Sequence, residues 1–325
     1  MHSISIPDPE RLHRLRGGAV MAPAPTAIFR VAGPGALTCL QGLWTNDLLE
    51  PGPNSLVYGA LLTPKGMIVA DGWAVRDEEQ VFLLLAPGAR EAVALILQRS
   101  LPPRLATATD LSDTSRVLHL LGDAALERWP VVPLGRLPDA GAVARGEAAD
   151  EAFLVGTPAA GPFAALLLGE SSAIDAAESV LAAAGLTAGN ENDREAARVI
   201  AGWPALGAEI DDRTLPQEVR FDEHAGVSYT KGCYTGQETV ARLHFRGHTN
   251  RVLRGLRWSA PPAEGDMVQA GEKQAGRVTS ILVLPDRCLG LGVVRRELDP
   301  GSRVTAGGSP AIVTDLPFGT GDLEG

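Results

Sequence analysis

The stretch KGCYTGQE, residues 231–238, holds one of only three cysteines in the chain, next to what reads as a helix start. Thr235 and Glu238 stand three residues apart, the spacing of a capping box, and predict a helix with Thr235 as its N-cap. A helix N-terminus is electropositive and Lys231 adds a positive charge, so we expect the Cys233 thiol to have a depressed pKa. The alternative is a small apolar residue in a glycine-flanked turn.

The composition describes a globular, acidic chain. Its 325 residues are enough for two or three domains, and 45% hydrophobic with 21% charged residues excludes a disordered protein. The sequence contains no membrane-spanning apolar run and no signal-peptide pattern at its start, which predicts a cytoplasmic protein without a membrane partner. Scattered cysteines without a C-x-x-C pair fit a reducing compartment and exclude a disulfide framework. The net charge of −10 argues against broad nucleic-acid binding.

The order of expected elements predicts two α+β units followed by a small all-β domain. Residues 1–110 combine strands with two helices, and residues 111–245 repeat this more loosely as a second, ferredoxin-like unit. Asn192 and Glu195 match a capping box that would start one helix of the second unit. Residues 246–325 read as short strands cut by glycine and proline turns, the pattern of an antiparallel barrel with almost no helix. The predicted class is α+β with a C-terminal antiparallel β-barrel.

Three segments together resemble one family. RVAGPGALTCLQGLWTNDL (30–48) and AGRVTSILVLP (275–285) resemble the two ends of the glycine-cleavage T-protein superfamily, the folate-dependent aminomethyltransferases. The central run 215–247, which contains KGCYTGQE, resembles the YgfZ-type folate-binding proteins more closely. That branch includes mitochondrial factors that help mature iron–sulfur enzymes. The resemblance implies a three-domain ring around a central folate pocket, with tetrahydrofolate or a related folate as the ligand. It also implies a functional Cys233, because the aminomethyltransferases carry an acid there.

The resemblance further implies a set of site residues. Cys233, Lys231 and Asp71 are the catalytic candidates, and Asp71 lies where the aminomethyltransferases have a catalytic acid. The candidates for binding the folate are Asn46, Asp47, Arg198, Gln217, Tyr234, Gln237 and Glu238. The alternatives are that Asp71 is a turn or surface acid and that Asn46 and Asp47 form a turn. No metal site is expected, because His244 and His248 lack a third ligand.

One departure from the family concerns the pterin ring. The aminomethyltransferases use the glutamate of an R-x-E-A-G segment to hold that ring, whereas residues 198–202 read RVIAG here. Ile200 cannot accept the hydrogen bonds that a pterin amidine offers. We therefore expect modest affinity, with Glu195 or Glu209 as substitutes, and expect Ile200→Glu to tighten binding by about 1–3 kcal/mol. Three tryptophans are candidates for stacking on the ring, with core packing as the simpler expectation: Trp44, Trp73 and Trp203.

An arginine-rich run reverses the charge of the chain locally. Residues 241–258 contain five arginines and two histidines but no acid. Arginine suits phosphates and polyglutamate tails, and the family has been linked to modified tRNA, so a tRNA contact through Arg242–Arg257 is one hypothesis. The other is that these arginines pair with acids elsewhere in the chain.

The leading interpretation is a tetrahydrofolate-binding protein that assists the assembly or repair of iron–sulfur enzymes and is linked to tRNA modification. Its partners would be folate and iron–sulfur client proteins or their assembly machinery, and Cys233 its working thiol. One alternative is a folate-dependent aminomethyltransferase, which needs a carboxylate such as Asp71 or Asp47 near the folate. Another is a thiol-redox or RNA-interaction module. The sequence leaves open whether the protein catalyses a reaction.

Overall fold

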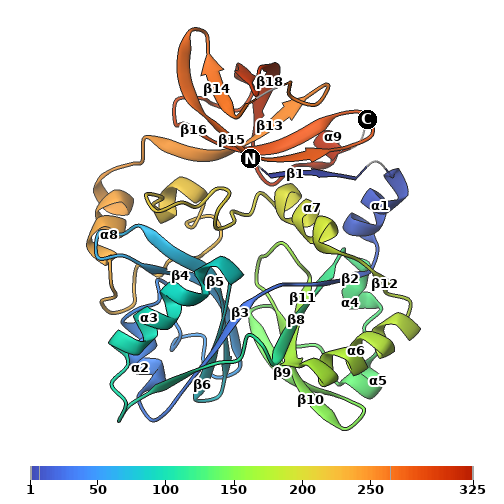
Figure 1. Cartoon of the computed structure of the whole chain (residues 1–325), viewed down its shortest axis with the longest axis vertical. Helices are drawn as coiled ribbons and strands as arrows, with labels where there is room; N and C mark the ends of the chain where they lie inside the picture. Colours follow the sequence, from blue (N-terminus) through green and yellow to red (C-terminus); the bar gives the residue numbers. More distant parts are fainter. Residues whose placement is uncertain (1, 7, 264, 324–325) are drawn as a thin grey trace.

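Three lobes surround a common centre in the computed structural model, which describes residues 2–6, 8–263 and 265–323 (Figure 1). Two α+β lobes share one long sheet, and a barrel lobe closes the third side. This confirms the expected ring of three lobes with a C-terminal antiparallel barrel. No helix in the described parts of the chain is long and apolar enough to span a membrane.

The two α+β lobes are the halves of an eleven-stranded sheet. Its order is β12 (Thr187–Ala188), β2 (Val20–Pro23), β8 (Ser115–Leu121), β11 (Ala165–Glu170), β10 (Glu151–Thr157), β9 (Ala142–Ala148), β4 (Ser55–Leu62), β5 (Ile68–Asp77), β6 (Gln80–Leu85), β3 (Ala27–Ala32) and β7 (Thr107–Asp110). A single registered pair, Ser55 with Ala142, joins β4 to β9. The two halves of the sheet therefore meet at a narrow junction.

Helices cover the outer face of each half-sheet. The first half carries α2 (Ala36–Gln41), the 3-10 turn η1 (Pro87–Ala89) and α3 (Arg90–Ser100), and the second carries α4 (Ala124–Glu127), α5 (Val131–Leu134) and α6 (Ser171–Ala183). In α6 the buried residues Ala173, Ile174, Ala177 and Leu181 recur every three or four positions. That spacing forms one apolar stripe, which packs on β8–β11.

The barrel lobe closes six antiparallel strands. They are β13 (Arg251–Trp258), β14 (Met267–Ala270), β15 (Lys273–Val283), β16 (Cys288–Arg295), β17 (Arg303–Ala306) and β18 (Ser309–Thr314). The only helix in this lobe, within the residues described, is the short α9 (Thr320–Leu323), so the expected barrel with almost no helix is confirmed. The first strand of the chain, β1 (His2–Ser5), adds to this sheet in parallel with β15.

Four further elements lie between the lobes: α1 (Pro9–Gly17), α7 (Glu191–Ala201), the 3-10 turn η2 (Pro216–Val219) and α8 (Gln237–Arg246). The predicted start of α7 was wrong by two residues. Its N-cap is Asn190, whose side chain accepts from the N–H groups of Asn192 and Asp193, while Asp193 accepts from the N–H of Asn190. The sequence holds two overlapping capping patterns, one starting at Asn190 and one at Asn192. The pattern starting at Asn190 has an additional tertiary contact, because the Asp193 carboxylate also pairs with Arg11 of α1.

The predicted start of α8 was also wrong. Its N-cap is Gly236 at φ 82°, not Thr235, and no side chain caps the helix. Thr235 instead donates its backbone N–H to the Gly42 carbonyl. A Cβ at position 236 would lie 2.6 Å from the Thr63 carbonyl oxygen, so the turn packs directly against the β4–β5 hairpin and requires glycine.

Candidate functional site

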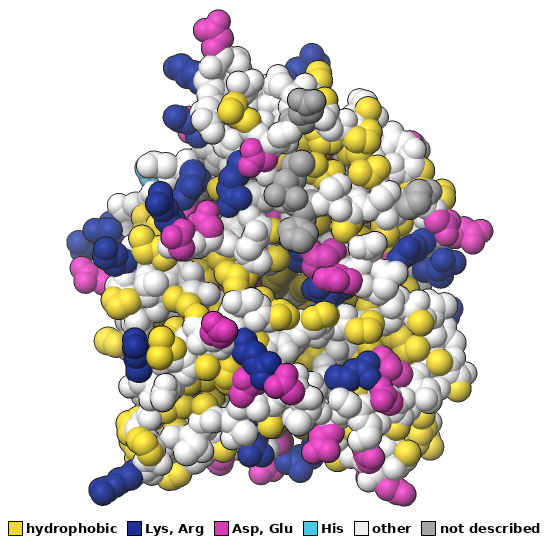
Figure 2. Space-filling model, viewed as in Figure 1, with side chains coloured by type: hydrophobic (Ala, Val, Ile, Leu, Met, Phe, Trp, Pro, Cys, Tyr) yellow, Lys and Arg dark blue, Asp and Glu magenta, His cyan; other side chains and the backbone are white. Residues whose placement is uncertain are grey.

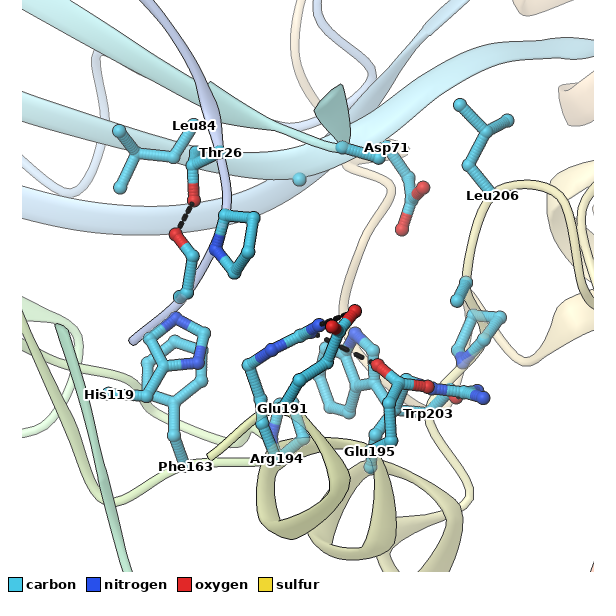
Figure 3. Close-up of a pocket in the computed structure, with 18 of the residues that line it drawn as sticks. Thr26, Asp71, Leu84, His119, Phe163, Glu191, Arg194, Glu195, Trp203 and Leu206 are labelled. Carbon is cyan, nitrogen blue, oxygen red and sulfur yellow. Dashed lines mark hydrogen bonds and ion pairs between the residues drawn. The ribbon is translucent and has the colours of Figure 1, made fainter. Parts of the chain in front are cut away.

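A cavity of about 530 Å³ lies at the centre of the ring, where the surface is hollowed in Figure 2. Its walls come from β1, β4–β6 and β8, from α7, and from the loops around residues 24–26, 162–163 and 203–208. Elements distant in the sequence therefore build one site, as the close-up in Figure 3 shows.

Asp71 enters the cavity from β5. Alternation along the strand places Asp71 and Trp73 on the same face, and Tyr58 of β4 is opposite Trp73 in register. The Tyr58 hydroxyl donates to the Asp71 carboxylate at 2.8 Å. Burial raises the pKa of Asp71 from 3.8 to about 6, while the Tyr58 hydrogen bond and the charge of Arg198 act in the opposite direction. Asp71 is thus a buried carboxyl group that changes protonation just below neutral pH.

One face of α7 lines the cavity opposite Asp71 (Figure 3). Glu191, Arg194, Glu195 and Arg198 follow the three- and four-residue spacing that places side chains on one helical face. Arg194 pairs with Glu191 at 3.7 Å and with Glu195 at 3.1 Å, and Glu195 also accepts from Arg198 at 2.8 Å. The buried Nε of Arg194 has no hydrogen-bond partner among the described residues. The face therefore offers carboxylate acceptors to the cavity.

Flat rings form the remaining walls. Trp73 and Trp203 stack with centroids 5.8 Å apart, and Phe163 meets Trp73 edge-on at 5.1 Å. His119 stacks on Phe163 at 4.1 Å, and burial lowers the pKa of His119 to about 3, so its imidazole is neutral. Of the three tryptophans considered from sequence, Trp73 and Trp203 line the cavity. Trp44 is fully buried in the core between the first half-sheet and its helices.

Arg198, which lines the cavity, forms a buried ion pair with Glu209 behind it, with Nη1 of Arg198 2.9 Å from Glu209. Glu209 is 0% exposed and also accepts from the hydroxyls of Thr279 and Ser280 on β15 and from the backbone N–H of Ala205. Both carboxylate oxygens are therefore occupied within the protein. Of the two expected substitutes for the missing glutamate, Glu195 faces the cavity and Glu209 does not line it.

Lys231 anchors the KGCYTGQE loop to another loop. Its ammonium donates to the carbonyls of Trp44 at 2.6 Å and Asn46 at 2.8 Å, and burial lowers its pKa to about 8. Asn46 donates to the carbonyls of Tyr58 and Ala225. These side chains hold loops together, and neither lines the cavity.

The Asp47 side chain organises its own turn. It accepts from the N–H groups of Leu49 and Glu50, and these bonds lower its pKa. These contacts fit the alternative that Asp47 forms a turn.

Cys233 is exposed and does not line the central cavity. It lies four residues before the first residue of α8, and the field of a helix dipole falls off within the first turn. Lys231 directs its ammonium to two carbonyls. The expectation of an activated thiol thus loses both features on which it rested, and exposure remains as its structural support.

The other predicted binding residues also lie outside the cavity wall. Gln217 donates to the Tyr229 hydroxyl and the Val240 carbonyl, and Tyr234 is buried with a hydroxyl that has no partner in the described structure. Gln237 and Glu238 occupy the first turn of α8, where Glu238 is exposed. The structure brings only Asp71 and Arg198 of the predicted set together at the cavity.

Replacing Lys231 with methionine is expected to lower the free energy of unfolding by about 1–3 kcal/mol, because two carbonyls beneath the loop lose their donor. Urea unfolding would measure the change. Lys65→Met is the matched control: Lys65 is exposed in the β4–β5 turn, where we expect a change within about 0.5 kcal/mol. Equal effects of the two substitutions would contradict an anchoring role for Lys231.

Comparisons with known proteins agree with this architecture. Residues 19–128 match the family described as the GCVT N-terminal domain. The tRNA-modifying protein YgfZ of Serratia proteamaculans is 39% identical over 111 residues, covering 32% of this chain and 34% of that protein. The tRNA-modifying protein YgfZ of Escherichia coli O45:K1 is 34% identical over 132 residues, covering 38% and 40%. Glycine cleavage system aminomethyltransferase T from Bartonella henselae superposes with a TM-score of 0.79 over 95% of this chain and 88% of its own, at 20% identity, which shows the shared fold.

Over part of its length the chain is thus similar in sequence to YgfZ-type proteins, and it shares the fold of aminomethyltransferase T. The sequence alignments span well under half the length of either YgfZ relative. The activity, substrates and partners of this chain are therefore matters for proposal.

Position 200 does not face the cavity. Ile200 packs against the large central core cluster, and its carbonyl accepts from the N–H of Phe318. A glutamate at this position would meet the core rather than a ligand in the cavity. The expected gain in affinity from Ile200→Glu therefore has no structural basis, and Glu195 is the better residue to test.

Sequence reasoning missed most of the cavity wall. The residues concerned are Tyr58, His119, Phe163, Glu191 and Arg194. The three- and four-residue spacing of Glu191, Arg194 and Glu195 could have indicated a polar helical face, but not which surface that face would meet. Among the described residues, no group of three or more His, Cys, Asp or Glu side chains is arranged to hold a metal ion.

Proposed function

We propose that this YgfZ-type protein binds a reduced folate, tetrahydrofolate or a close relative, in the central cavity. We further propose that it serves the assembly or repair of iron–sulfur enzymes linked to tRNA modification, with Cys233 as its exposed thiol. The observation that carries the proposal is the cavity itself, in which the carboxylates of α7 and the carboxyl group of Asp71 face each other between aromatic walls. The names of the relatives support the link to tRNA.

The residues present fit such a ligand. A volume of about 530 Å³ lies within the range of pockets that enclose small molecules. Glu191 and Glu195 offer acceptors for the amidine donors of a pterin, and Trp73 and Phe163 offer flat apolar surfaces.

A titration with tetrahydrofolate under anaerobic conditions tests the proposal. We expect Glu195→Gln to weaken binding about 10- to 150-fold, because a hydrogen bond to a charged group contributes roughly 1.5–3 kcal/mol. Tryptophan fluorescence of Trp73 and Trp203 gives a direct readout, since both indoles line the cavity.

Two variants outside the cavity are the controls. Glu238→Gln makes the same chemical change on exposed α8, and Cys233→Ala removes the thiol. Both should bind tetrahydrofolate as the wild type does. A Glu238→Gln variant that lost as much affinity as Glu195→Gln, or a wild type that did not bind, would contradict folate binding in the central cavity.

The position and pKa of Asp71 favour a second candidate, folate-dependent one-carbon transfer. When bound, the folate would supply the carrier of the one-carbon unit. The Asp71 carboxyl group, with a pKa of about 6 and a hydrogen bond from Tyr58, can hold or release a proton inside the cavity near neutral pH. If the protein catalyses this transfer, the Asp71→Asn variant should still bind folate but should no longer turn over an aminomethyl donor. A wild type that binds folate without turnover leaves the binding proposal standing and ends this one.

The thiol assignment predicts an order of reactivity. Cys233 is exposed, Cys39 is partly buried, and Cys288 is fully buried with a pKa raised by that burial. At pH 7 iodoacetamide should therefore modify Cys233 first and Cys288 last, because access and thiolate fraction set the rate. Mass spectrometry of a time course measures this order. If Cys39 reacted before Cys233, the proposal of Cys233 as the accessible working thiol would fail.

A further inference from the structure

The structure divides the arginine-rich run into a paired and an unpaired part. On β13, Arg251 makes a two-pronged contact with Glu218 at 3.0 and 3.2 Å, and Arg254 and Arg257 lie 3.8 and 4.0 Å from acids. On α8, Arg242 and Arg246 are exposed and have no ion pair with any residue that the structure describes. Pairing with acids therefore accounts for the strand arginines and leaves the helix arginines unexplained.

An exposed aromatic ring lies between the two unpaired arginines. Phe245 is 66% exposed, and the spacing of residues 242, 245 and 246 places these three side chains on one face of α8. His244 stacks on Tyr229 with centroids 3.6 Å apart, and Phe245 meets His244 edge-on at 4.8 Å. The Tyr229 hydroxyl donates to Asp222, which also lies 3.6 Å from His244. The ring of Phe245 is thus supported from beneath and open to solvent.

We propose that this α8 surface, formed by Tyr229, Arg242, His244, Phe245 and Arg246, binds a single-stranded segment of RNA, with an unpaired base on Phe245 and phosphates on the two arginines. The proposal rests on the RNA link of the proposed function and adds the form of RNA and the residues that contact it. Aromatic rings stack on bases without regard to sequence, and arginine binds phosphate through two parallel hydrogen bonds.

The charge of the chain favours a single strand over a duplex. A duplex needs a broad basic surface, and this protein has a net charge of −10 with only two unpaired arginines on a helix about 15 Å long. Stacking on Phe245 also requires a base that is free of its neighbours, as in a loop. The α8 surface lies at the outer edge of the molecule, so an RNA strand can reach it without entering the ring (Figure 1).

The test is fluorescence anisotropy with a labelled twelve-nucleotide single-stranded RNA, and with the same strand in a duplex, without folate. We expect Phe245→Ala to weaken single-strand binding about 5- to 150-fold and Phe245→Trp to retain it, because stacking persists with another ring. Arg242→Gln with Arg246→Gln should reduce the slope of log affinity against log salt by about 1.4, the value for two phosphate contacts on a single strand.

A matched pair of arginines controls for net charge. Arg99 lies in the last turn of α3 and Arg104 follows it; both are exposed and have no ion pair with a described residue. Arg99→Gln with Arg104→Gln should leave RNA affinity nearly unchanged. Thermal unfolding of all variants shows whether the loss of cations near the C-terminus of α8 has only weakened the helix.

Each outcome has a distinct meaning. If the wild type binds the single strand and Phe245→Ala binds it equally well, the α8 proposal is overturned while an RNA partner remains. Tighter binding of the duplex, or an equal loss from the Arg99/Arg104 pair, also overturns it. If the wild type binds neither RNA, the tRNA part of the proposed function fails with it, and the tetrahydrofolate titration is unaffected.

Discussion

Asp71→Asn is expected to gain stability relative to the wild type as pH rises from about 4 to above 6, by up to about 3 kcal/mol. The pKa of Asp71 is raised from 3.8 to about 6, so the folded protein holds this proton more tightly than the unfolded chain. The folded wild type therefore loses stability through Asp71 as pH rises across that window, and a rise of this size corresponds to roughly 3 kcal/mol. Asparagine does not ionise and removes the loss.

Urea unfolding at pH 4, 5, 6 and 7.5 measures the difference between variant and wild type. Tyr58→Phe is an informative control, because the Tyr58 hydroxyl donates to the carboxylate and holds its pKa down. Without that hydroxyl, the pKa of Asp71 should rise further, and the pH range over which Asp71 destabilises the folded protein should extend to higher pH. A difference between Asp71→Asn and the wild type that stays constant from pH 4 to 7.5 would show that Asp71 is not ionising inside the folded cavity.

Breaking the Arg198–Glu209 pair is expected to have an effect of similar or larger size. Arg198→Met leaves Glu209, which is 0% exposed, without its ionic partner. Removing one member of a buried pair typically costs about 3–5 kcal/mol, because the remaining charge is buried without compensation. The same carboxylate binds Thr279 and Ser280 of β15, so the loss should loosen the contact between the barrel and the cavity wall.

The double variant Arg198→Met, Glu209→Leu separates the pair from its isolated members. It should recover part of the lost stability, since neither charge remains buried. Glu297→Gln provides an exposed control: its pair with Arg295 lies on the surface, and its loss should leave the free energy of unfolding nearly unchanged. If the double variant lost more unfolding free energy than the two single variants lose together, the hydroxyl contacts of Glu209, rather than the ion pair, would hold the barrel in place.

Local sequence signals predicted the elements that depend on local chemistry. The hairpins of β4, β5 and β6 lie where alternating apolar runs meet turn residues, and the end of α7 falls at Gly202, which adopts φ 65°. The barrel followed from closely spaced glycines and prolines. The start of α7 was missed because Asn190 and Asn192 both fit a cap, and the contact of Asp193 with Arg11 is invisible in a local pattern.

The candidate site was predicted less completely than the fold. Family resemblance identified Asp71 and Arg198, which the structure brings to one cavity. The same resemblance also suggested Asn46 and Lys231 as site residues, but their polar groups bind backbone carbonyls instead. A polar side chain in a sequence motif can serve a ligand or the loop that carries it, and only the three-dimensional partners distinguish these roles.

The pairing of β1 with β15 has a consequence for the order in which the protein folds. The register sets His2 beside Ser280, so the first strand must wait for one of the last, and closing so long a loop is slow. Ser3 and Ile4 of β1 also line the cavity. During synthesis the central cavity therefore stays incomplete until the barrel has emerged from the ribosome, so the proposed folate can bind there only after the two ends of the chain have paired.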